Sequence, residues 1–197
     1  MRYKSDITGF TPWQPSTWPE HLEADDDFIQ TLTRILNDTI LDEIMNVMDD
    51  SRKIDFGGRG HVIGLSMFCA IDTISSYFLN DVDSDKCEKC GRGDRIGPRY
   101  KCYIEKYFPD PYNRYANQIY KLFRNVMTHS WNLFEVAIIS RGTTIQVNNG
   151  ALILGLEELF EALNKSAQQA LKDMASDDEI KKSCLLRYSE LRKTAKS

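Results

Sequence analysis

Apolar residues at helical intervals constrain the fold of this chain more than any other feature of its sequence. From Asp25 to Met48 they recur every three or four positions, which predicts one long amphipathic helix. Asp25, Asp26 and Asp27 favour a helix start here, because carboxylates cap free N–H groups and complement the helix dipole. The apolar positions are Phe28, Leu32, Ile35, Leu36, Ile40, Ile44, Val47 and Met48.

A second helix is predicted from about His61 to Leu79. It is apolar on most of its surface, which is typical of the central helix of a bundle. It also contains Asp72 and several Ser and Thr residues, so it is too polar to be read as a membrane span. No apolar signal region follows Met1. We therefore expect a cytoplasmic protein that does not associate with membranes.

The rest of the chain alternates helical and strand patterns. A third helical segment begins near Tyr100, breaks at Pro109-Asp110-Pro111 and runs on to about Ser130. The β-branched residues of 134–140 and 143–147, separated by Arg141-Gly142, predict a short β-hairpin. A fourth helix is expected over about 151–174, and Ser176 with Glu179 predicts a capping box that opens a last helix.

These patterns predict an all-α fold, an up-and-down bundle of about five helices with a small β-hairpin after the third. The chain has 197 residues, 42% of them hydrophobic, which suits one domain. We assign this domain to residues 25–197, with a polar insertion at 80–99. Residues 1–24 hold three of the six prolines and two tryptophans, and are expected to form an irregular arm.

Charge is unevenly distributed along the chain. The formal net charge is −4, which excludes a uniformly basic surface. Residues 20–50 carry ten acids against one base, whereas residues 86–124 carry ten bases against four acids. The basic segment indicates a polar or anionic partner. The alternative is that the two segments face each other and cancel.

The residues best suited to chemistry lie late in the third helix, in the segment Leu122-Phe-Arg124-Asn125-Val-Met-Thr-His129. A histidine can exchange a proton with a ribose 2′-hydroxyl or with a leaving 5′-oxygen near neutral pH. An arginine offers a fork of donors to a phosphate. This pair therefore suits metal-independent cleavage of a phosphodiester.

Geometry limits how these two side chains can cooperate. On one helix Arg124 and His129 would lie about 140° and about 7.5 Å apart, so they do not easily face one ligand. Two copies related by a two-fold axis would bring both pairs into one cleft, which predicts a homodimer. In the alternative, Arg124 pairs with an acid of the first helix and His129 caps its own helix.

The segment Tyr120-Lys-Leu-Phe-Arg124-Asn125-Val-Met-Thr-His129-Ser-Trp131, in an all-helical chain, resembles the HEPN superfamily. Members of that superfamily are helical bundles that dimerise around a motif of Arg, four to six residues and His. Active members are metal-independent ribonucleases of toxin–antitoxin and defence systems. The resemblance implies that Arg124 and His129 are catalytic and that Asn125 supports them. Arg114 and Lys121, which belong to the basic segment, are the candidate residues for binding the RNA substrate.

The same resemblance leaves a second function open. Some HEPN proteins bind RNA or a protein partner without cleaving, and related families pair with an antitoxin-like nucleotidyltransferase. The N-terminal arm, the insertion and the hairpin depart from the pattern of the family. A non-catalytic binding module is thus the alternative to a ribonuclease.

Two further features carry weaker signals. Cys87 and Cys90 have the spacing of a zinc knuckle, with Cys102 as a third ligand of a structural zinc and no fourth ligand nearby. Plain reduced thiols are the alternative for these cysteines. Aromatic residues from Tyr100 to Tyr115 lie among the bases, and they predict either stacking on single-stranded RNA or a buried helix face.

Overall fold

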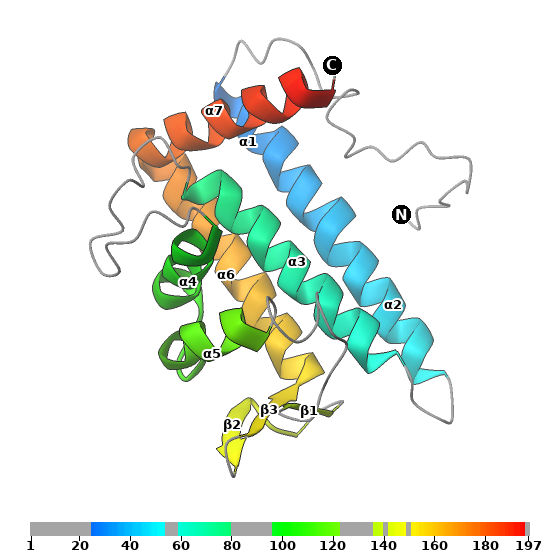
Figure 1. Ribbon diagram of the computed structural model, residues 1–197. Coiled ribbons are helices and arrows are strands. Elements are labelled where there is room, and N and C mark those ends of the chain that lie inside the picture. The colour runs from blue at the N-terminus through cyan, green and yellow to red at the C-terminus, as the bar shows by residue number, and fades with distance from the viewer. Residues whose placement is uncertain are drawn as a thin grey trace.

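The computed structural model shows a helical bundle with a small three-stranded sheet at one end (Figure 1). It describes residues 25–53, 59–79, 96–122, 136–139, 142–148 and 151–195. The predicted all-α bundle with a small hairpin is confirmed. The predicted arm, 1–24, and residues 80–95 of the predicted insertion lie outside the described residues. Residues 96–99 are helical, so the predicted insertion extends four residues too far at its C-terminal end.

The first predicted helix is confirmed and continues to Arg52. It consists of α1 (Asp25–Arg34), a π-helical stretch (Ile35–Leu41) and α2 (Asp42–Arg52). Its apolar stripe packs into the core through Phe28, Leu32, Leu36, Ile44 and Met48, all of which are buried. The wider π-helical turns keep the chain helical through residues Ile35 to Leu41.

Helix α3 (Gly60–Phe78) is the centre of the bundle, as predicted. It contacts α2, α4 (Ile96–Tyr107), α6 (Leu156–Ser176) and α7 (Asp178–Ala195). By length and composition alone α3 is apolar enough to cross a membrane, but 61% of its most apolar window is buried inside the bundle. The buried hydroxyl groups of Ser75 and Ser76 are satisfied within the helix, because they donate to the carbonyl oxygens of Asp72 and Thr73.

The break at Pro109–Pro111 divides the third predicted helix as expected. Helix α4 ends at Tyr107, a single 3-10 turn spans Tyr112–Tyr115, and α5 (Ala116–Lys121) follows. In Figure 1, α4 and α5 lie on one side of α3, and α1 and α2 lie on the other. The described parts of the acidic and the basic segments therefore lie on different sides of α3.

The strands pair differently from the prediction. The chain forms β1 (Val136–Ile139), β2 (Ile145–Asn148) and β3 (Ala151–Gly155), in the order β1-β3-β2. β2 and β3 are the antiparallel hairpin, while β1 is parallel to β3 instead of pairing with β2. The fourth helix accordingly starts at Leu156 and not near 151. Asn149-Gly150, a dipeptide that favours two-residue hairpin turns, was the signal for this pairing in the sequence.

The prediction that Ser176 caps the last helix is also wrong. Asp177 caps α7, because its Oδ1 accepts hydrogen bonds from the backbone N–H groups of Glu179 (2.9 Å) and Ile180 (3.3 Å). Ser176 instead donates to the carbonyl oxygens of Lys172 and Asp173 at the end of α6. The carboxylate is the better acceptor for the free N–H groups of a helix start.

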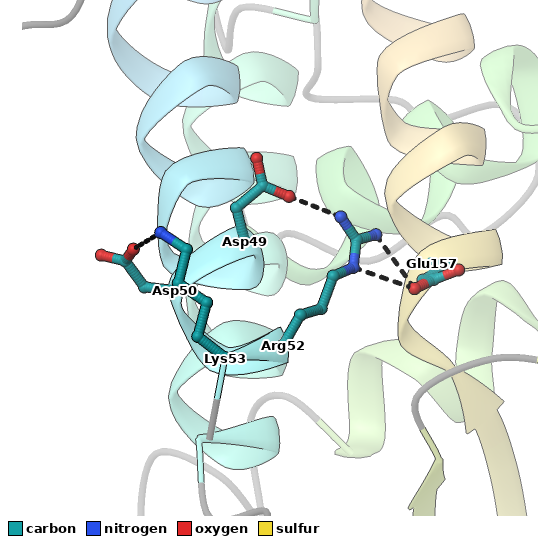
Figure 2. A network of polar contacts seen from close by, with 5 residues as sticks. All are labelled: Asp49, Asp50, Arg52, Lys53 and Glu157. Carbon is teal, nitrogen blue, oxygen red and sulfur yellow. Dashed lines mark hydrogen bonds and ion pairs between the residues drawn. The ribbon is translucent and has the colours of Figure 1, made fainter. Parts of the chain in front are cut away.

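An ion-pair network joins the end of α2 to the start of α6 (Figure 2). The Arg52 guanidinium bonds Glu157 Oε1 through Nη2 (2.9 Å) and Nε (3.2 Å), and it also contacts Asp49. Lys53 pairs with Asp50 beside it. The hydrogen bond to Glu157 is the first cause of a raised pKa of Arg52. Since the side chains of Arg52 and Glu157 are partly exposed, the network adds little to the free energy of unfolding, and its main effect is to align α2 with α6.

Replacing Ile71 by Ala tests whether α3 is the centre of the core. Ile71 is fully buried, so Ile71→Ala should lower the free energy of unfolding by about 2–5 kcal/mol. Val62 lies on the same helix but is 47% exposed, and Val62→Ala should change it by less than about 0.5 kcal/mol. Urea denaturation of both variants measures the difference, and equal losses would contradict the assignment of the core.

Candidate active site

The predicted catalytic residues Arg124, Asn125 and His129 lie outside the described residues. The structure does show what flanks them. On one side, α5 ends at Lys121 and is followed by Leu122, which is buried. On the other side, β1 begins at Val136. We refer to residues 123–135 as the motif segment.

Helix α5 is held against α4 by Tyr120. The Tyr120 ring covers Gly97 so closely that a Cβ at residue 97 would lie 2.9 Å from ring atoms. The ring also packs against Tyr100, with centroids 5.5 Å apart, and the Lys101 ammonium lies 5.8 Å from its centroid. Tyr120, four residues before Arg124, therefore fixes the end of α5 against α4.

An ion pair joins α4 to α3 in the same region. Arg99 Nη2 lies 3.3 Å from Asp72 Oδ1, and the side chain of Arg99 is only 8% exposed. The neighbouring Tyr100 is fully buried. Burial is the first cause of the strongly raised pKa of Tyr100, and the charges of Asp72 and Cys69 add to it. Sequence reasoning missed this pair, since residues 27 positions apart give no local signal.

The sheet that begins after the motif segment is anchored to the bundle at two points. The Tyr112 hydroxyl donates to the Thr144 carbonyl oxygen (2.9 Å), and the Gly142 N–H donates to Glu158 Oε1 (2.6 Å). Gly155 is closely flanked, because a Cβ there would run into the Thr143 carbonyl oxygen and the Glu158 carboxylate. The helix and the sheet on either side of the motif segment are thus both tied to the core.

The two predicted RNA-binding residues are described, and both are exposed. Arg114 lies in the 3-10 turn and is paired with Asp110 (2.7 Å). Lys121 is the last residue of α5. Both belong to the side of the bundle that carries α4 and α5, away from the acidic α1 and α2 (Figure 1). Their position is compatible with an anionic ligand, and Lys121 lies three residues before Arg124.

Most of the aromatic run belongs to the core, so the stacking interpretation is wrong for these residues. Tyr103 packs on Tyr107 and Phe108, with centroids 5.1 and 6.1 Å away, and its hydroxyl lies 3.2 Å from Ser166 Oγ. The buried members of the run are Tyr100, Tyr103, Tyr107, Phe108 and Tyr112.

The zinc prediction stays a prediction. Cys87 and Cys90 lie outside the described residues, and Cys102 is a half-buried reduced thiol on α4. Within the described ranges, no group of three or more His, Cys, Asp or Glu side chains is placed to hold a metal ion. Cys184 is buried, and burial raises its pKa to about 12.

Comparisons with models of protein families, with curated proteins and with solved structures gave no match for this chain.

The buried tyrosines predict loss of stability at alkaline pH. Burial raises the pKa of each above the usual value of about 10, so the unfolded chain releases these protons first as the pH rises. Each group should then lower the free energy of unfolding by up to about 1.4 kcal/mol per pH unit above pH 10. The tyrosines concerned are Tyr77, Tyr100, Tyr103, Tyr107 and Tyr112.

Urea denaturation at increasing pH measures this loss, and ultraviolet absorbance of tyrosinate follows ionisation in the folded protein. We expect several of the nine tyrosines to stay protonated until the protein unfolds. Ionisation of all nine near pH 10 in the folded state would contradict the prediction.

Proposed function

We propose that this protein is a metal-independent endoribonuclease of the HEPN type, which cleaves single-stranded RNA in a cleft shared by two copies of the chain. The observation that carries the proposal is the Arg124-Asn125-x3-His129 motif directly after α5. The fixed position of α5 supports it, because catalytic groups act best when the elements that carry them are rigid. We place this activity in the cytoplasm.

The proposed reaction is transfer of the phosphoryl group to the ribose 2′-oxygen. His129 takes the proton of the 2′-hydroxyl as this oxygen attacks phosphorus, and the bond to the 5′-oxygen breaks. A protonated histidine, from the second copy in a shared cleft, gives a proton to that leaving oxygen. Arg124 stabilises the charge that develops on the phosphate, and Asn125 orients the pair. The products are a 2′,3′-cyclic phosphate and a 5′-hydroxyl.

Charge supports an RNA substrate in this part of the molecule. Lys121 is exposed close to the motif in the sequence, and Arg114 lies in the preceding turn. The chain as a whole is acidic, with a net charge of −4. Single-stranded RNA would therefore be drawn to the α4–α5 side, because only a local excess of bases can attract phosphates to such a protein.

The first test compares the wild type with His129→Ala on labelled single-stranded RNA in EDTA. We expect the wild type to produce 2′,3′-cyclic phosphate ends and His129→Ala to be slower by about 10²–10⁴-fold, the usual contribution of a general acid or base. His61→Ala is the matched control, since His61 lies at the start of α3 and has no proposed role.

Equal cleavage by the wild type and His129→Ala would contradict the proposed site. RNA binding without cleavage by either protein would favour the alternative, a non-catalytic module that binds RNA or an antitoxin-like protein.

A second test concerns the two exposed bases. Lys121→Ala should weaken RNA binding for all sequences and reduce the slope of log K against log salt by about one, because one phosphate contact is lost. Arg114→Ala should have a smaller effect, since Arg114 is already paired with Asp110. Fluorescence anisotropy at several salt concentrations measures both. An Arg114 effect larger than that of Lys121 would contradict this order.

A further inference from the structure

Strand β2 is an edge strand of the described sheet. The Gly155 N–H donates to the Thr144 carbonyl oxygen (3.4 Å), so the backbone groups of Thr144 face β3. Backbone groups alternate in direction along a strand, so those of Gln146 and Asn148 also face β3. The N–H and C=O groups of Ile145 and Val147 therefore point away from the sheet.

The sequence of this strand and its flanks carries none of the charged side chains or prolines that usually keep edge strands apart. Soluble proteins usually protect an open edge with charged side chains, proline or a bulge. Residues 142–154 contain no Asp, Glu, Lys, Arg or Pro, although 27% of the chain is charged. Val147 is also 48% exposed, whereas Ile145, on the same face of the strand, is buried.

We propose that the β2 edge pairs with the β2 edge of a second copy, in antiparallel orientation, to form one continuous sheet through the dimer. A two-fold axis beside Gln146 places Ile145 of each copy opposite Val147 of the other. Because these are the residues whose backbone groups point outward, each pair exchanges both of its hydrogen bonds. The exposed Val147 side chain of each copy then packs across the strands beside Ile145 of the other copy.

Charge favours a second copy as the occupant of this edge. Two chains of net charge −4 repel each other, and they approach most easily where both surfaces are neutral. An edge that is neutral from residue 142 to residue 154 selects a strand that is also neutral, and β2 itself meets this condition. A two-fold contact uses the same surface on both copies, so no second complementary surface is needed.

This inference uses described residues only and does not rest on the proposed ribonuclease activity. Arg124, Asn125 and His129 of the proposed cleft lie outside the described residues, and none of them enters the argument for β2 pairing. The two proposals have separate readouts, namely RNA cleavage for the cleft, and sedimentation and hydrogen exchange for the β2 pairing.

Sedimentation of the wild type, Val147→Lys and Val62→Lys tests the interface over about 1 µM to 1 mM, since a small interface binds weakly. We expect Val147→Lys to reduce the limiting mass by half, because the lysine is charged and strongly hydrated. Val62 is equally exposed, at 47%, but lies on α3, so Val62→Lys should behave as the wild type. Equal masses for all three proteins, or equal losses for both variants, would overturn the proposal.

Hydrogen exchange of the wild type gives a second measurement that needs no variant. The amides of Gln146 and Asn148 should be protected at every concentration, because they face β3. Those of Ile145 and Val147 should become protected only as the concentration rises. Protection of Ile145 and Val147 that does not depend on concentration would show that another part of the same chain covers the edge, and would overturn the proposal.

Discussion

Enclosure of α3 is the constraint on which the rest of the structure depends. A helix that is apolar around most of its circumference is stable in water only when other elements cover it. Here α2, α4, α6 and α7 all contact α3. Its buried residues include Met67, Phe68, Ile71 and Ile74, each with no more than a trace of exposed surface. The positions of the other helices follow from the need to cover these side chains.

The helices could be predicted from sequence because their signals are local. The spacing of apolar residues gave α1–α2 and α3, and the prolines gave the break between α4 and α5. The sheet was predicted less well, since strand pairing joins residues that have no fixed separation. Residues 151–155 continue the apolar pattern of the helix that follows them, so the pattern predicted a helix where the chain forms the strand β3. Backbone pairing with β1 on one side and β2 on the other holds these residues in a strand.

The candidate site could be predicted only as a motif and a charge pattern. Arg124 and His129 are recognisable from type and spacing, and Arg114 and Lys121 from their place in the basic segment. The side chains that hold the neighbouring elements in place were not recognisable. Asp72 and Arg99 pair between two helices, and Tyr120 packs over Gly97. Such contacts depend on how helices are placed in space, which the local sequence does not specify.

The direct junction of β3 and α6 has a mechanical consequence. No loop separates the strand from the helix, because Gly155 ends one and Leu156 begins the other. The crowding around Gly155 leaves little room for the strand to turn against the helix. Helix α6 has 21 residues and is about 31 Å long, so it acts as a rigid lever. A force applied to the sheet at one end of the molecule is transmitted along this lever to α7 at the other.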